Sequence, residues 1–162
     1  MLLEFKFENV LDLLATLPPL FLFVSNRDNN TISIFDISNP LSPVLVEVFG
    51  NAEELNGPTE LAITGNTLYV SNQFDNTISI YDIFVPPTPM QFVKKFGGAG
   101  ELTGSAGLAI TGNTLYIANQ LANTVSIFDV FTPPVPVRIG EFGADVLHAP
   151  TGLAIFLPPA PV

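Results

Sequence analysis

Apolar and polar residues alternate along short segments of this chain, and turn-forming residues separate one segment from the next. In residues 67–72, Leu68 and Val70 fall on one side of an extended segment, and Tyr69 and Ser71 fall on the other. Gly65-Asn66 stands just before this segment, and both residues accept the positive φ of a tight hairpin. Alternation with a period of two predicts β-strands, and no helical period is present in this unit. The pattern therefore predicts an all-β fold.

The alternating pattern occurs three times. Residues 22–26 return in closely similar form as residues 68–72 and 115–119, and each of these segments ends on asparagine. The asparagines are 72 − 26 = 46 and 119 − 72 = 47 residues apart. A repeat of this length, built from short strands, is typical of the four-stranded blade of a β-propeller. The sequence thus predicts three four-stranded antiparallel β-propeller blades.

Each copy divides into strands at its glycine, asparagine and proline residues. The expected strands are 20–26, 31–37 and 44–49 in the first copy, 61–64, 67–72, 77–82 and 91–96 in the second, and 107–111, 114–119, 124–130 and 137–142 in the third. The inner strand of the first copy is unclear, and residues 14–17 are a degraded candidate for it. We expect an atypical segment at 1–19, three repeats at 20–157 and a loose tail at 158–162. The segment at 1–19 would be either an edge strand or the degraded inner strand.

The two ends of the repeat array depart from the pattern. Residues 152–156 have the sequence of a further inner strand, but no blade follows them. Because three blades are too few to close a propeller, we expect a partial propeller. It is completed either by self-association or by the missing blades of a longer chain. We predict that 152–156 pairs beside strand 20–26, in the same chain or in a partner.

Composition narrows the range of partners. The chain has a net charge of −10 with only five basic residues, so a nucleic acid partner is not expected. Hydrophobic residues make up 48% of the chain, which excludes disorder and suits sheets that are covered on both faces. Cysteine is absent, so disulfides and thiolate metal sites are excluded. No signal peptide or transmembrane segment is recognised, no membrane partner is expected, and the compartment stays undetermined.

Several motifs resemble known propeller repeats. Tyr69-Val70-Ser71-Asn72 followed by Asn76-Thr77-Ile78-Ser79-Ile80 resembles the YVTN repeat, and Asp36-Ile37-Ser38-Asn39-Pro40 is similar to the LVIVD repeat. The Gly-Pro-x-x-Leu-Ala entry at 57–62 and the Gly-Asn hairpin resemble NHL repeats, although Thr77 and Thr124 replace the arginine that NHL blades often carry. The resemblance implies a β-propeller whose function is that of a scaffold, a partner-binding domain, or one of a few lyases and hydrolases.

The turns after the second strand of each copy form the candidate binding face. They share one side of the expected propeller with the longer loops at 50–59, 97–106 and 143–151, and variable loops on a rigid frame are where ligands usually bind. Asn26, Asn72 and Asn119 could ring a ligand, but bonding within their own hairpins is the favoured role for asparagine in such turns. The candidate binding residues are Asn26, Arg27, Glu60, Gln73, Phe74, Gln120 and His148.

Catalytic chemistry has little support in the sequence. His148 is the only histidine and a weak candidate for a general base. Asp36, Asp82 and Asp129 suit turns better than calcium ligation, because no second carboxylate lies near any of them. No metal or cofactor is expected. The favoured function is a non-catalytic scaffold that binds a protein, a peptide or a small ligand through its loop face. The alternative is a lyase or lactone hydrolase that uses His148 with Glu60 at the central mouth.

Overall fold

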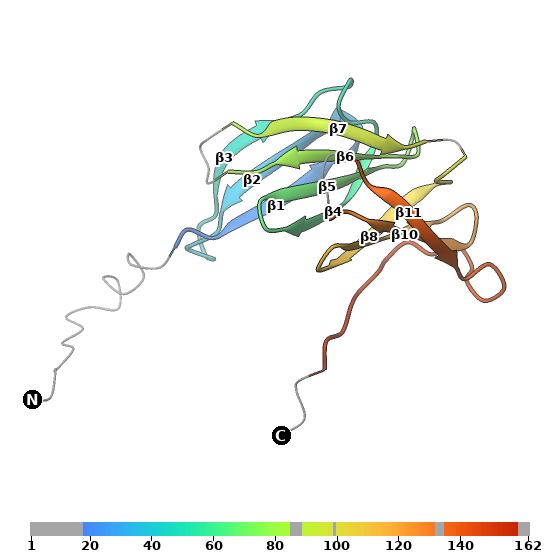
Figure 1. Ribbon diagram of the computed structural model, residues 1–162. Coiled ribbons are helices and arrows are strands. Elements are labelled where there is room, and N and C mark those ends of the chain that lie inside the picture. Colours follow the sequence, from blue (N-terminus) through green and yellow to red (C-terminus); the bar gives the residue numbers. More distant parts are fainter. Residues whose placement is uncertain (1–17, 85–88, 99, 132–134, 159–162) are drawn as a thin grey trace, which may run out of the picture.

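The computed structural model describes residues 18–84, 89–98, 100–131 and 135–158, which form three antiparallel sheets stacked one upon the next (Figure 1). The first sheet comprises β1 (Phe21–Asn26), β2 (Thr31–Asp36) and β3 (Val44–Phe49), with a short 3-10 helix η1 (Arg27–Asn29) between β1 and β2. The second comprises β4 (Pro58–Thr64), β5 (Thr67–Asn72), β6 (Thr77–Asp82) and β7 (Gln91–Gly97). The third comprises β8 (Ser105–Thr111), β9 (Thr114–Asn119), β10 (Thr124–Asp129) and β11 (Val137–Phe142).

The sheets have the strand order of propeller blades. Within each sheet, strands that are neighbours in the sequence pair as antiparallel neighbours, in the order β1-β2-β3, β4-β5-β6-β7 and β8-β9-β10-β11. The all-β fold and its propeller blades are therefore confirmed. Blades 2 and 3 have the four strands expected of them, whereas blade 1 has three among the described residues. The candidate for its inner strand, residues 14–17, lies outside the described residues.

One expectation is wrong within the chain. Residues 152–156 were expected to form a strand beside β1, but the structure shows no strand among them. The segment instead lies against blade 3, where the carbonyl of Thr151 closely approaches Gly107 of β8. It cannot reach β1 because the whole of blade 2 stands between blades 1 and 3. Pairing with β1 of a partner stays a prediction.

Neighbouring blades pack through opposite faces of their sheets. We call the side of a blade that meets the preceding blade its leading face, the other side its trailing face, and the packed contact between two blades a seam. Blade 2 presents Leu68, Val70 and Tyr81 to blade 1, and Tyr69, Ile78 and Ile80 to blade 3. Alternation along β5 and β6 therefore places apolar side chains in two seams at once. Both faces of the middle blade are covered, which accounts for the high hydrophobic content of the chain.

A leucine between consecutive blades closes each seam at one end. Leu55 precedes blade 2 and Leu102 precedes blade 3, and both side chains are buried. Each packs at a glycine, Gly50 or Gly97, where the leucine leaves no room for a side chain and where the positive φ of 94° or 86° also favours glycine. Leu147 packs at Gly143 in the same way after blade 3, but it is only half-buried. Leu147 is thus in place for a third seam, and no blade follows it among the described residues.

Candidate functional site

The asparagines that end the second strand of each blade stabilise the frame. The side-chain amide of Asn72 donates to Thr77 Oγ1 at 3.2 Å and to Ser79 Oγ at 2.8 Å, both within the same hairpin. Its carbonyl accepts the backbone N–H of Asn56 at 3.0 Å. Asn119 repeats the two donations to Thr124 and Ser126, and Asn26 repeats them to Thr31 and Ser33. The three amides are thus oriented toward their own strands and do not form a ring open to a ligand.

A second set of asparagines ties each turn to the linker that enters the next blade. Asn30, Asn76 and Asn123 have left-handed backbones, with φ of 55°, 59° and 59°. Their side-chain carbonyls accept the N–H of Gly57 at 2.8 Å, of Gly104 at 2.6 Å and of Ala149 at 2.7 Å, respectively. This role was not predicted from the sequence. The signal was present as an asparagine before the threonine that opens the third strand of every copy.

The side chains between these two sets of asparagines meet across the seams. The Arg27 guanidinium lies 4.7 Å from the centre of the Phe74 ring, so a cation from blade 1 covers an aromatic ring from blade 2. The Gln73 amide donates to the Gln120 side chain at 3.3 Å, which joins blade 2 to blade 3. Arg27 is exposed, and the Phe74 side chain is 56% exposed although one side of its ring covers Gly57. Four of the predicted residues are therefore brought together on one face.

The remaining predicted residues are not joined into a catalytic pair. Glu60 is exposed on β4, and His148 is exposed in the linker after blade 3. No hydrogen bond between the two is present in the part of the chain that the structure describes. Gly107 and Gly152 stand at the positions equivalent to Glu60, so the carboxylate is not repeated. Among the described residues, no group of three or more histidine and acidic side chains is placed to hold a metal ion.

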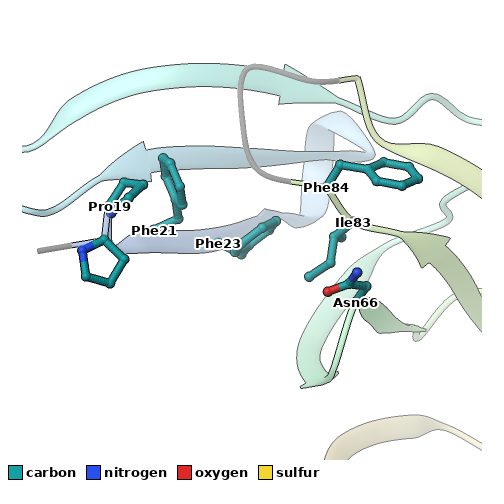
Figure 2. Close-up of a pocket in the computed structure, with 7 residues that line it drawn as sticks. Pro19, Phe21, Phe23, Asn66, Ile83 and Phe84 are labelled. Carbon is teal, nitrogen blue, oxygen red and sulfur yellow. The ribbon is translucent and has the colours of Figure 1, made fainter.

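Two clefts lie at opposite ends of the first blade. A polar cleft of about 430 Å³ is lined by the η1 turn, from Asn26 to Asn29. An apolar cleft of about 410 Å³ lies beside β1, where Phe21 and Phe23 face Asn66 and Ile83 of blade 2 (Figure 2). The polar cleft belongs to the same face as Arg27 and Phe74. The apolar cleft borders the edge of β1 that has no strand partner among the described residues.

Two tyrosines in the seams have raised pKa values. Burial raises the pKa of Tyr81 far above its ordinary 10.0, and the charge of Glu54 adds to this because the Tyr81 hydroxyl donates to that carboxylate at 3.1 Å. Burial also raises the pKa of Tyr69, with a smaller effect from the charge of Asp82. Both phenols are held neutral and stabilise the seams, so neither is suited to act as a base.

No helix among the described residues is long and apolar enough to cross a membrane.

Solved structures support the fold assignment. A functionally unknown protein from Desulfotomaculum acetoxidans DSM 771 superposes with a TM-score of 0.63 at 23% identity, over 83% of this chain and 42% of that protein. The computationally designed Ika4 protein gives 0.58 at 17% identity, over 84% of this chain and 74% of its own. The designed Ika8 protein gives 0.56 at 17% identity, over 84% and 39%. These likenesses show the fold alone, and the chain spans less than half the length of the first protein.

Family models match the repeats themselves, whereas no curated protein matches the chain. The LVIVD repeat matches residues 21–50, which supports the resemblance seen in the first copy. The likeness to YVTN and NHL repeats stays a prediction. The model described as lactonase, 7-bladed beta-propeller matches residues 41–132, more than half of the chain. The repeat, the stacked blades and this match lead to one conclusion: the chain belongs to the lactonase, 7-bladed β-propeller family.

Proposed function

We propose that this chain is a non-catalytic binding module that holds a ligand on the face formed by the turns after β1, β5 and β9. The observation that carries the proposal is the meeting of turn side chains from three blades, with Arg27 4.7 Å from the Phe74 ring centre and Gln73 bonded to Gln120 at 3.3 Å. These residues lie outside the repeated asparagine network that stabilises each hairpin. Arg27 replaces the glutamine of the other two blades, and Phe74 stands where they have Asp28 and Leu121. Such variation on a regular frame is suited to recognition.

The composition of this face indicates the chemistry of the ligand. Arg27 supplies a planar cation, Gln73 and Gln120 supply amide donors and acceptors, and Phe74 supplies an exposed ring. A guanidinium beside amide groups binds carboxylates or carbonyl groups well. We therefore favour a small ligand or peptide that carries a carboxylate or several carbonyl groups. The net charge of −10 repels an anionic ligand at long range, so a carboxylate would depend on the local contact with Arg27.

The test is a binding screen with mapped contacts. Peptide, glycan and carboxylate libraries are screened against the chain, and backbone NMR shifts locate any ligand. The proposal expects shifts at Arg27, Gln73 and Gln120, and a loss of at least tenfold in affinity in Arg27→Gln. Arg138→Gln is the matched control, because Arg138 lies on the outer strand β11 and pairs with Glu141. Binding that maps away from the turns, or equal affinity in both variants, would overturn the proposal.

Lactone hydrolysis is the second candidate, favoured by the family match. His148 would act as general base and Glu60 would orient it or the attacking water, with both groups at the central mouth. A panel of lactones tests this candidate directly. Hydrolysis abolished by His148→Ala and retained in Arg27→Gln would place this function first. Unchanged turnover in His148→Ala would remove it.

A further inference from the structure

The linker after blade 3 already takes the path of a linker that enters a fourth blade. The N–H of Ala149 bonds to Asn123 Oδ1 at 2.7 Å, as that of Gly57 bonds to Asn30 at 2.8 Å and that of Gly104 to Asn76 at 2.6 Å. Beyond it, Leu153, Ala154 and Ile155 line a small cavity of about 140 Å³ against the trailing face of blade 3. The segment 151–156 thus occupies the place of an inner strand but pairs with no strand among the described residues.

Blade 1 has the complementary defect. In blades 2 and 3 the second strand pairs on both sides, but β1 pairs only with β2 among the described residues. Its open edge borders the apolar cleft of about 410 Å³ lined by Phe21 and Phe23 (Figure 2). Among the described residues, one end of the structure therefore has a segment in the place of an inner strand with no blade beyond it, and the other end has a blade without an inner strand.

The register of the complete blades specifies how the two would pair. In blade 2, Leu61 is opposite Val70, Ile63 is opposite Leu68 and Thr64 is opposite Thr67. Blade 3 repeats this register, with Thr111 opposite Thr114. Applied to residues 151–156 and β1, the same register places Leu153 opposite Val24, Ile155 opposite Leu22 and Phe156 opposite Phe21.

In one of these pairs, both residues differ from those at the equivalent positions of blades 2 and 3. Where blades 2 and 3 have threonine opposite threonine, the new pair has Phe156 opposite Phe21. Phe156 is 82% exposed in the single chain, and the register directs it into the cleft that Phe21 lines. Two aromatic residues directly opposite each other stabilise an antiparallel pair. In blades 2 and 3 a Gly-Asn hairpin joins the two threonines. Leu157-Pro158 follows Phe156 instead, and Pro19-Leu20 precedes Phe21. Proline does not suit such a hairpin, so these replacements are expected if the two strands belong to different chains.

We propose that a second copy of this chain completes blade 1, with residues 151–156 of each copy forming the inner strand of the other. The seams within the chain show what the exposed faces require. Phe49 packs edge-to-face on Tyr81, and Phe96 on Phe128, with ring centres 5.1 Å apart in both cases. The equivalent residues at the open ends are Phe142 on blade 3 and Phe35 on blade 1. A trailing face of one copy therefore fits the leading face of the other. Two copies supply six blades, one fewer than the seven in the family's description but within the roughly four to eight that close a propeller.

Paired cysteines test the exchange and its register together, since the chain has no cysteine of its own. Single variants are mixed and oxidised in four combinations. The proposal expects disulfide-linked heterodimers from Phe156→Cys with Phe21→Cys and from Ile155→Cys with Leu22→Cys. The two exchanged combinations, Phe156→Cys with Leu22→Cys and Ile155→Cys with Phe21→Cys, are matched controls, because they place neighbouring thiols on opposite faces of the sheet.

The expected yield of the two in-register pairs is at least fivefold above that of the exchanged pairs. All four positions are exposed or half-buried in the single chain, so each variant retains the buried seams. Equal yields from the four combinations, or no heterodimer at concentrations where the unmodified chain is folded, would overturn the proposal. The second outcome would assign the open faces to blades outside this chain.

Discussion

The seam between blades 2 and 3 and the leading face of blade 1 are made from nearly the same residues but differ in burial. Leu115 and Ile117 of blade 3 are fully buried against blade 2, whereas the equivalent Leu22 and Val24 of blade 1 are 48% and 37% exposed. The local strand pairing is the same in both blades, residue for residue. The difference therefore lies in the neighbour alone: each blade is built to be covered by another, and blade 1 has no preceding blade among the described residues.

The trailing face of blade 3 is also open, but the residues that close a seam are already in place there. Leu147 packs at Gly143, and the N–H of Ala149 in the following linker bonds to Asn123, as in the two closed seams. Phe142, however, is 52% exposed, whereas the equivalent Phe49 and Phe96 pack on tyrosine or phenylalanine of the next blade. The path of each linker is thus fixed by contacts with the blade that precedes it, whereas the aromatic contacts form only when a following blade is present.

The largest expected effect comes from removing the same leucine at a closed and at an open position. Leu115→Ala leaves a cavity in a packed seam and should lower the free energy of unfolding by about 2–5 kcal/mol. Leu22→Ala removes a side chain that is half exposed in the single chain, so it should cost less than about 1.5 kcal/mol in dilute solution. Urea unfolding of both variants measures the difference. Equal losses at concentrations where the chain is monomeric would contradict the account of the open face.

The second effect concerns the asparagine network. Asn72→Ala removes two buried donations, to Thr77 and Ser79, and leaves the N–H of Asn56 without its acceptor, so we expect a loss of about 2–3 kcal/mol. Asn26→Ala removes the same two donations at a half-buried site that water reaches. It should therefore cost about 1 kcal/mol or less. Thermal unfolding compares the stability of the two variants. A larger loss of stability in Asn26→Ala would contradict the interpretation that water reaches the hairpin of blade 1 more easily than that of blade 2.

The third effect is a loss of stability in alkali. The pKa of Tyr81 is raised in the folded chain, so above the ordinary value of 10.0 the unfolded chain releases this proton while the folded chain retains it. Stability should be constant below that pH and then fall by about 1.4 kcal/mol per pH unit for this tyrosine. Unfolding measured between pH 9 and 11 should show a shallower slope in Tyr81→Phe. An unchanged slope would mean that the seam between blades 1 and 2 does not hold the phenol neutral.

The smallest effect concerns the linker after blade 3. Ala149 has a φ of 47°, whereas the equivalent Gly57 and Gly104 reach 65° and 68° without steric cost. Ala149→Gly should relieve about 1 kcal/mol of backbone strain, partly offset by the greater freedom of the unfolded chain. Hydrogen exchange of the amide at position 149, corrected for the intrinsic rates of alanine and glycine, should then be slower in the variant than in the unmodified chain. Faster exchange would show that the hydrogen bond from the N–H of residue 149 to Asn123 does not form.

The sequence was most informative where residues act locally. The alternation and the Gly-Asn hairpins predicted β5, β6, β9 and β10 to within a residue, because strand pairing inside a blade depends on neighbours in the sequence. The hairpin role of Asn26, Asn72 and Asn119 was predicted for the same reason. The contact between Arg27 and Phe74 could be placed only on a common face, since it crosses a seam between residues 47 positions apart.

The sequence was least informative at the ends of the array. Residues 152–156 have the pattern of an inner strand, but a strand also needs a partner, and β1 lies two seams away. The sequence pattern does not show whether β1 lies close enough to residues 152–156 to pair with them. The apolar cleft beside β1 was likewise missed, because no motif marks it and β1 has no inner neighbour among the described residues.

The central claim is that the open faces of blades 1 and 3 are complementary seams, and the native mass of the purified chain tests it most directly. Sedimentation velocity over a range of concentrations should show a species of twice the 17.4 kDa chain mass. Val24→Glu, which places a charge on the leading face of blade 1, should shift that species to a single chain. A folded monomer of 17.4 kDa at every concentration, with no change in Val24→Glu, would contradict the claim.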